Sequence, residues 1–346
     1  MSKLGIKKNT RSNAITYLIV IVAFVLFTIL SNGGVLGRKT VGLLVPACCY
    51  IVMAISLNLT VGILGELSLG HAGFMSVGAF AGVVASTGLS STITSAPLRL
   101  AVAMVIGALF AAIAGFLIGI PVLRLRGDYL AIVTLAFGEI IKEIISCLIV
   151  GTDEKGLHIV FNYNGAKTVD DLGLTPTGTA IIKGAQGATG TQTIASFTAG
   201  FVLIMVALVI VLNFVNSRSG RAVMAIRDNR IAAESVGINI TKYKMIAFTI
   251  SAAIAGAAGA LYGLNYSNIT SAILVFVVLG GLGNIRGSII SATVLYVLPE
   301  ALREFADYRM LVYAIVLILV MIATNSSKVR TLLTRLLPHK REKEVD

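Results

Sequence analysis

The sequence is poor in charged residues, which make up only 13% of its 346 residues. Hydrophobic residues make up 56%, and the mean hydropathy is +0.91. A soluble chain of this length could not bury so much apolar surface, so a soluble enzyme or soluble binding domain is excluded. Several apolar runs follow one another, each close to the roughly 17 to 25 residues needed to cross a bilayer core. The composition therefore predicts a helical membrane protein that crosses the bilayer many times.

Cysteine is also scarce. The three cysteines, Cys48, Cys49 and Cys147, lie in apolar runs without a CxxC pair or a histidine at ligand spacing. The sequence thus predicts neither a disulfide framework nor a metal site. It also lacks GxxxxGK[ST], HExxH and GxSxG motifs, and its apolar runs hold too few acidic residues for a proton pump. We expect no catalytic activity, no cofactor bound directly by this chain, and no energy-coupling device of its own.

The net charge is +12, but the basic residues sit between the apolar runs and in the tails rather than on one folded face. This distribution is typical of a multi-pass membrane protein beside anionic lipid, not of a nucleic-acid-binding protein. The basic N-terminus and the apolar run 14–30 resemble a signal sequence in outline. Residues 31–33, however, are Ser-Asn-Gly, which is a poor cleavage site, so we expect an uncleaved first span.

Uninterrupted apolar runs predict seven crossings. They cover residues 14–30, 41–64, 69–87, 98–123, 129–150, 197–215 and 245–264. After them comes run 272–298, which a Gly-rich turn interrupts, and then run 308–323. The glycines of that turn are Gly280, Gly281, Gly283 and Gly287.

The distribution of lysine and arginine indicates whether run 272–298 crosses once or twice, because these residues stay cytoplasmic in short loops. A hairpin leaves 19 basic residues inside and 8 outside, whereas a single crossing leaves 14 inside and 12 outside. We therefore predict an all-α polytopic fold of about ten segments, including a short Gly-interrupted hairpin, with both termini cytoplasmic. The arms are short, so a re-entrant pair buried in protein stays an alternative. The predicted parts are an N-tail 1–13, a transmembrane domain 14–323 and a basic C-tail 324–346.

Two hydrophilic regions are too long to be simple turns. The outer loop 151–195 has 45 residues, eight of them glycine, and predicts a docking surface or lid, with disorder as the alternative. The inner loop 216–244 alternates small or apolar residues with charged residues at helical spacing, and Gly237 is suited to end a helix. We expect one or two short amphipathic helices on the cytoplasmic face, resting on lipid headgroups or docked into another protein.

Small residues recur every fourth position in two of the apolar runs. This spacing places them on one helix face, where they allow close backbone approach, and it indicates a tightly packed bundle rather than a functional site. The two sets are Gly107, Ala111, Gly115 and Gly119 in one run, and Ala252, Gly256 and Ala260 in the other.

Polar residues at membrane depth gather in segment 61–80, where Glu66, Ser68 and His71 follow Gly62 and Gly65. We expect a broken or re-entrant backbone here, covered by protein or by a water-filled cavity. Ionisable residues inside a membrane segment are a functional hypothesis by default. The alternative is that Glu66 and His71 cap helix ends or sit at the cytoplasmic interface, where their cost is small.

A further acidic residue, Glu139, lies 11 residues past Asp128, about 16 Å along a helix axis and close to the bilayer centre. Lys142 at position i+3 is a geometrically suitable partner, so the pair has either a structural role or a role in the substrate pathway. Asp128 itself is placed to cap the start of this helix.

Four motifs together resemble the inner-membrane permease subunits of ABC importers for branched-chain amino acids. They are GELSLGHAGF within 62–80, RLRGDYLAIVTLAFGE at 124–139, GRAVMAIRDNRIAAESVGINITKYK at 220–244, and VVLGGLGNIRGSIISA at 277–292. The resemblance implies a multi-pass subunit of the bacterial plasma membrane that forms half of an alternating-access path for leucine, isoleucine and valine. It also implies a homologous second permease subunit, two cytoplasmic P-loop ATPase subunits that use the ATP, and an extracytoplasmic solute-binding protein.

The resemblance also assigns roles to individual residues. Ala232, Ala233 and Gly237 occupy the alanine pair and glycine of a coupling helix that sits in a cleft of the ATPase, with Ile231 in place of the leading glutamate. Two departures from the family are Glu66, where many relatives carry glutamine, and a short connection 265–271. The expected coupling residues are Arg227, Ala232, Ala233, Glu234 and Gly237. The candidate pathway residues are Glu66, Ser68, His71, Phe74 and Glu139.

Two alternatives stay open at the level of the sequence. Related permeases carry urea, short amides or other amino acids, and nothing in this sequence specifies the cargo directly. The rival mechanism is a secondary transporter or channel that uses Glu66, His71 and Glu139 for ion coupling.

Overall fold

The computed structural model describes residues 2–34, 37–125, 127–153, 156–162, 165–176 and 178–270. Beyond these it describes only residues 285, 287–289, 292–293, 296–297 and 315. Most of the predicted hairpin 272–298, nearly all of run 308–323 and the C-tail 324–346 therefore lie outside the described residues.

Each of the seven uninterrupted apolar runs contains a long helix. These helices are α1 (Ser2–Asn32), α2 (Arg38–Asn58), α3 (His71–Gly88), α4 (Ala96–Val122), α5 (Asp128–Ser146), α6 (Phe197–Asn216) and α9 (Ile240–Gly263). Within the described residues, five segments are long and apolar enough to cross a membrane: 13–32, 40–64, 96–122, 197–216 and 240–263. α3 and α5 are not among these five segments, and α5 carries four charged residues.

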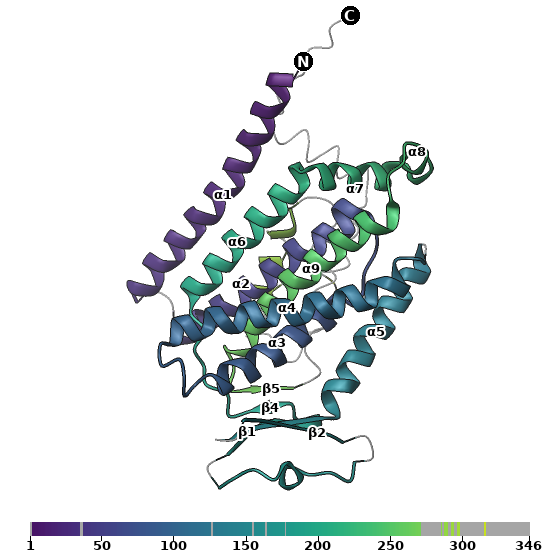
Figure 1. The fold of residues 1–346 in the computed structure, drawn as a ribbon. Helices are drawn as coiled ribbons and strands as arrows, with labels where there is room; N and C mark the ends of the chain where they lie inside the picture. The colour runs from purple at the N-terminus through teal and green to yellow at the C-terminus, as the bar shows by residue number, and fades with distance from the viewer. Residues whose placement is uncertain are drawn as a thin grey trace, which may run out of the picture. The chain divides into compact units, whose positions relative to one another are not determined.

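The bundle is organised around α9, which packs against α2, α3 and α4 (Figure 1). Small residues permit this packing: a Cβ added to Gly78 of α3 would lie 2.1 Å from the carbonyl oxygen of Gly256, and one added to Gly256 would lie 2.3 Å from Cβ of Ala111. Backbones this close exclude larger side chains. The predicted packing role of the two small-residue stripes is confirmed.

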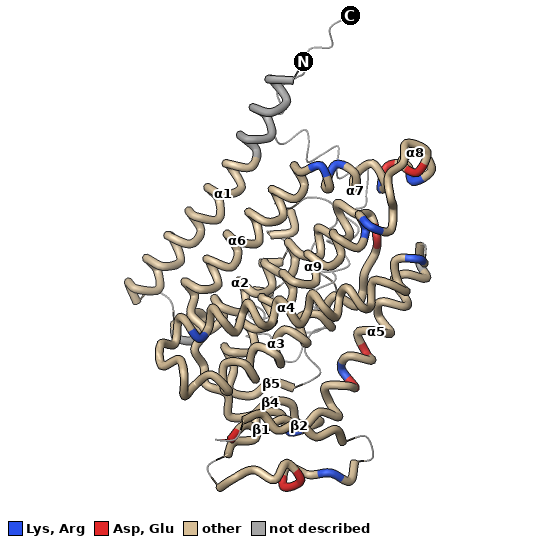
Figure 2. Tube along the Cα trace, in the orientation of Figure 1, with Lys and Arg blue, Asp and Glu red and all other residues tan. Residues whose placement is uncertain are grey.

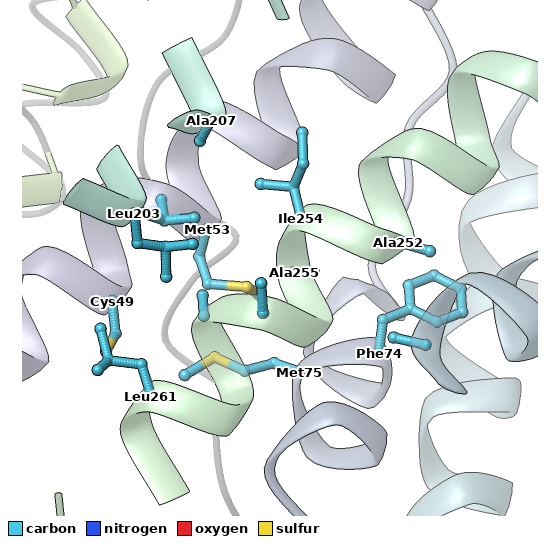
Figure 3. Close-up of a cluster of buried hydrophobic side chains, with 14 of the residues drawn as sticks. Cys49, Met53, Phe74, Met75, Leu203, Ala207, Ala252, Ile254, Ala255 and Leu261 are labelled. Carbon is cyan, nitrogen blue, oxygen red and sulfur yellow. The ribbon is translucent and has the colours of Figure 1, made fainter. Parts of the chain in front are cut away.

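Larger side chains fill the space on the other side of α9. Figure 3 shows Cys49 and Met53 of α2, Met75 of α3, and Leu203 of α6 close to α9. All four residues are buried. The two cysteines in α2 are free and buried, in agreement with a packing role.

A small antiparallel sheet is the main departure from the predicted all-α fold. Its strands are β1 (Leu148–Asp153), β2 (Gly156–Phe161), β3 (Thr179–Lys183), β4 (Ala188–Thr189) and β5 (Asn268–Ile269), in the order β2-β1-β3-β4-β5. The outer loop 151–195 is therefore folded, with short 3₁₀ turns at Val169–Leu172 and Gly184–Gln186. β-branched residues buried in β1 and β3, among them Ile149, Val150, Ile181 and Ile182, favour strands over continued helix.

The sheet changes two details of the prediction. The apolar run 129–150 does not stay helical to its end, because α5 ends at Ser146 and β1 begins at Leu148. The short connection 265–271 contains β5, whose Ile269 and Asn268 pair with Ala188 and Thr189 of β4. The connection thus adds the last strand to the sheet formed by the outer loop.

The inner loop forms α7 (Arg218–Asp228) and α8 (Arg230–Ser235), at the opposite end of the bundle from the sheet (Figure 1). Figure 2 shows charged residues gathered along α7 and α8, whereas the long helices between the two ends are mostly uncharged. Two short helices are within the range that the sequence predicted for this loop.

Candidate functional site

The candidate site is centred on the break between α2 and α3. α2 continues into a π-helix, Leu59–Leu64, which ends at Gly65 with a φ of +79°. That left-handed conformation is open to glycine and costly for other residues. Residues 66–70 are not helical, and α3 begins at His71. The predicted break is confirmed, and it has the π-helical form that is frequent at functional sites.

A buried hydroxyl cluster surrounds His71. Ser56, Thr60 and Ser251 are fully buried, and His71 is 1% exposed. Nε2 of His71 lies 2.7 Å from Oγ of Ser56 and 3.3 Å from Oγ of Ser251. Oγ1 of Thr60 donates to Oγ of Ser251 at 2.8 Å. The cluster therefore joins α2, the π-helix, α3 and α9.

The donors in this cluster can be assigned. Oγ of Ser56 donates to the carbonyl oxygen of Ser251 at 2.6 Å, and Oγ of Ser251 donates to the carbonyl oxygen of Ser56 at 2.7 Å. Because each hydroxyl has one hydrogen, Nε2 of His71 must donate to Oγ of Ser56. This assignment leaves Nδ1 of His71 without a partner among the described residues.

Two other predicted pathway residues lie close to His71 in the chain. Ser68 is fully buried, and its hydroxyl has no partner among the described residues. The ring of Phe74 is edge-on to His71, with centroids 5.7 Å apart, and edge-on to Phe248 at 5.5 Å. Ser68, His71 and Phe74 are thus inside the bundle, and their contact with a substrate stays a prediction.

Glu66 does not cap α3, whose N-cap residue is Gly70. Its carboxylate instead forms an ion pair with the ammonium group of Lys244, near the start of α9. The side chains are 15% and 5% exposed, so this pair is largely removed from solvent. The sequence analysis had not identified Lys244 as its partner.

Arg227, near the end of α7, lies against the same break. Its Nη1 donates to the carbonyl oxygen of Gly62 at 2.9 Å, and its Nη2 donates to Asp228 at 2.9 Å. A Cβ added to Gly65 would lie 2.6 Å from Cγ of Arg227, so the aliphatic part of this side chain covers the turn. The structure therefore places the expected coupling residue Arg227 against the break between α2 and α3 of its own chain.

Thr134 of α5 contacts the end of the break that lies next to α3. Its Oγ1 accepts a hydrogen bond from the backbone N–H of Leu69 at 3.0 Å. A Cβ added to Gly70 would lie 1.9 Å from the carbonyl oxygen of Thr134, so this close approach requires glycine. Sequence reasoning missed this contact.

The structure does not bring Glu139 to this cluster. Glu139 lies on the outer face of α5, where it accepts a hydrogen bond from Nζ of Lys142 at 2.8 Å. Their side chains are 60% and 38% exposed within this single chain. The i,i+3 pair expected from the sequence is confirmed, and a pathway role for Glu139 stays a prediction.

The other expected coupling residues lie on α8 and just after it. The side chain of Asn229 caps α8 by accepting from the N–H of Ala232 at 3.0 Å, and Gly237 ends the turn with a φ of +81°. Ala233 is buried, whereas Ala232 and Glu234 are exposed. The apolar side chains of Ile231 and Val236 are 81% and 74% exposed, which the sequence analysis did not predict.

Of the Gly-rich turn, Gly280, Gly281 and Gly283 lie outside the described residues, and Gly287 is helical. The neighbouring Ser288 is buried and accepts a hydrogen bond from Nδ2 of Asn58 at 2.9 Å. This contact links the segment after the turn to the end of α2.

Sequence reasoning also missed Ser56, Thr60 and Ser251. The available signal was weak: Ser56 and Thr60 are one helical turn apart within a long apolar run, and Ser251 is one of a few hydroxyl residues in another. Nothing in either run indicated that they meet.

The structure defines a multi-pass helical membrane protein with a charged helix pair at one end and a sheet at the other. Residues 39–321 match the family described as the branched-chain amino acid transport system permease component. The chain belongs to this family, and it is therefore a non-catalytic transport permease subunit.

Individual relatives support the assignment of the chain to this family. The high-affinity branched-chain amino acid transport system permease protein LivM of Escherichia coli is 33% identical over 301 residues, which cover 83% of this chain and 69% of the relative. The LivM protein of Salmonella typhimurium is 33% identical over 303 residues, with the same coverage. The probable LivM permease of Methanocaldococcus jannaschii is 25% identical over 299 residues, covering 75% of this chain and 80% of the relative. No solved structure matches the chain.

Proposed function

We propose that this chain forms half of the alternating-access path of an ATP-driven importer for leucine, isoleucine and valine. A homologous second permease subunit supplies the other half. Two cytoplasmic ATPase subunits hydrolyse the ATP, and an extracytoplasmic solute-binding protein delivers the amino acid. The cargo is proposed from the names of the relatives, all of which are branched-chain amino acid permeases.

The observation that carries this proposal is the helix pair α7–α8. α8 has a defined start at Asn229 and a defined end at Gly237, and the apolar side chains of Ile231 and Val236 project from its exposed surface. Exposed apolar residues on a short capped helix suit insertion into a groove of another protein. We propose that this groove belongs to the ATPase subunit and that Ala232, Ala233, Glu234 and Gly237 shape the docking surface.

We further propose ten membrane segments with both termini in the cytoplasm of a bacterial cell, in its plasma membrane. The basic helix α7 and the folded outer loop lie at opposite ends of the bundle, which supports opposite sides of the membrane for them. The sheet then faces the solute-binding protein. A cysteine-accessibility scan that labels the outer loop only after permeabilisation would contradict this orientation.

The test is uptake of labelled leucine by cells with and without this gene, in a strain without a redundant leucine system. An uncoupler is present throughout, and isoleucine, valine, urea and an unrelated amino acid serve as competitors. We expect the gene to restore uncoupler-resistant uptake that isoleucine and valine inhibit.

Two results would overturn parts of the proposal. Uptake that the uncoupler abolishes would support the ion-coupled transporter instead. Inhibition by urea or an unrelated amino acid, without inhibition by isoleucine and valine, would replace the cargo but keep the permease.

A further inference from the structure

We infer that Arg227 and Lys244 are positioning residues that transmit movement of α7–α8 to the broken segment 59–71. The inference rests on the proposed function, in which an ATPase subunit moves this helix pair. It adds a specific route from the moving helices to the interior of the bundle. It also gives Arg227 a role inside the permease rather than on the ATPase surface.

The first connection is made by Arg227. Its guanidinium group binds the carbonyl oxygen of Gly62 inside the π-helix, and its aliphatic part lies on Gly65 at the end of that helix. A bond from Nε to Asp228, 3.1 Å long, fixes the guanidinium group from the other side. The end of α7 is therefore attached to the break by both polar and apolar contacts.

The second connection is the ion pair between Lys244 and Glu66. Lys244 lies in the first turns of α9, at the end of the inner loop, and Glu66 is the first residue after the left-handed Gly65. Because both side chains are largely buried, separating them would leave unpaired charges in an apolar surrounding. The pair therefore keeps the start of α9 next to the non-helical residues 65–70 when either one moves.

The broken segment carries these constraints further into the bundle. Its α3 end is bound to Thr134 of α5 through Leu69, and His71 at the start of α3 belongs to the hydroxyl cluster with Ser56 and Ser251. When α7 or the start of α9 moves, it displaces Gly62 or Glu66. Segment 59–71 is held at both ends, so it either changes its own conformation or moves α3. Transition between discrete packed states is how small displacements are amplified in proteins.

The test uses the complete transporter in proteoliposomes with its ATPase and binding protein, and measures leucine uptake per ATP hydrolysed. We expect Arg227→Ala to lower this ratio by about fivefold or more, as is typical for the loss of coupling between linked sites. The matched control is Arg221→Ala on the same helix, because Arg221, among the described residues, binds the carbonyl oxygen of Asn216 at the helix start and not the break. This control should keep the wild-type ratio.

Exchanging the charges of Glu66 and Lys244 distinguishes a positioning role of the ion pair from a role in folding alone. Glu66→Lys and Lys244→Glu should each abolish coupled uptake, because like charges then face each other in a buried place. The double exchange restores opposite charges, and we expect it to recover most of the uptake per ATP hydrolysed. If the single variants fail to fold, leucine uptake per ATP hydrolysed by the double variant alone tests the inference.

A third variant tests whether the contact between Gly65 and Arg227 matters. Gly65→Ala introduces a Cβ that displaces Arg227, whereas Gly173→Ala introduces the same positive-φ strain where nothing lies within 4 Å. We expect uncoupling only for Gly65→Ala. Combining it with Arg227→Ala should cause no further loss, because both variants remove the same contact.

Wild-type uptake per ATP for both Arg227→Ala and the single charge reversals would overturn the inference and leave the proposed function intact. An additive loss in the Gly65 and Arg227 double variant would also contradict it. Absence of ATP-driven leucine uptake by the unmodified complex would instead overturn the proposed function.

Discussion

The ammonium group of Lys244 pairs with the carboxylate of Glu66, although the two residues are 178 positions apart in the chain. The pair connects the start of α9 to residues 65–70, the non-helical stretch between the π-helix and α3. An ion pair in such a place adds little net stability compared with apolar residues, but loss of one partner leaves an uncompensated charge. We therefore expect the pair to position the start of α9 relative to the residues after the π-helix, and we expect its loss to destabilise the protein.

Loss of this ion pair should destabilise the protein, in contrast to loss of an exposed lysine two residues earlier in α9. We expect Lys244→Ala to lower the free energy of unfolding by about 3 kcal/mol, because Glu66 stays buried without its partner. Lys242→Ala removes an exposed side chain and should leave stability nearly unchanged. Thermal unfolding of the purified, detergent-solubilised complex compares the two. Equal melting temperatures would contradict the burial of the Lys244 pair.

The hydroxyl cluster gives a second prediction. Ser251→Ala removes the donor to the Ser56 carbonyl oxygen and the acceptor for Thr60, so we expect a loss of about 1 to 3 kcal/mol. The control is Ser235→Ala, since Ser235 is exposed and donates to the carbonyl oxygen of Ala232 in its own turn. The same melting experiment checks both variants. A larger shift for Ser235→Ala would show that the buried cluster is not formed.

The close packing of α3 on α9 gives a third prediction. Gly78→Ala places a methyl group 2.1 Å from the carbonyl oxygen of Gly256, which forces the two backbones apart. We expect a loss of at least about 3 kcal/mol, the upper range for overpacking. Gly42→Ala in α2 meets nothing within 4 Å and should be neutral or stabilising by about 0.5 to 1 kcal/mol. The yield of monodisperse complex after solubilisation measures the difference, and equal yields would contradict this packing.

A fourth prediction concerns α8. Ile231→Asp replaces the most exposed apolar side chain of the proposed ATPase-docking surface with a charge, and should weaken ATPase binding by about tenfold or more, as for an interface hot spot. The control is Leu157→Asp on β2, because Leu157 is 51% exposed at the opposite end of the bundle. Retention of the ATPase on an affinity-tagged permease is the measurement. Equal retention by both variants would exclude Ile231 from the interface.

Several features could be predicted because they depend on local sequence. Apolar runs located the seven long helices of the described residues, the glycines at 62 and 65 marked the break, and Gly237 marked the end of the α8 turn. The small-residue stripes predicted close helix packing, which follows from side-chain size at fixed helical spacing. These signals are each contained within one element.

Features that depend on which elements meet could not be predicted in this way. The partner of Glu66 is 178 residues away, and the partners of His71 are single hydroxyl groups in two other helices. The sheet was missed because its strands are short and β5 lies far from the others in sequence. A composition rich in glycine made the outer loop look irregular, although pairing between strands organises it.

The most direct test of the account is ATP-driven uptake by the purified complex. Proteoliposomes contain this chain with its second permease subunit and ATPase, ATP is enclosed inside, and the solute-binding protein loaded with labelled leucine is added outside. No ion gradient is imposed. We predict leucine accumulation that requires ATP and that Ile231→Asp reduces. Accumulation without ATP that depends on an imposed ion gradient would contradict the account.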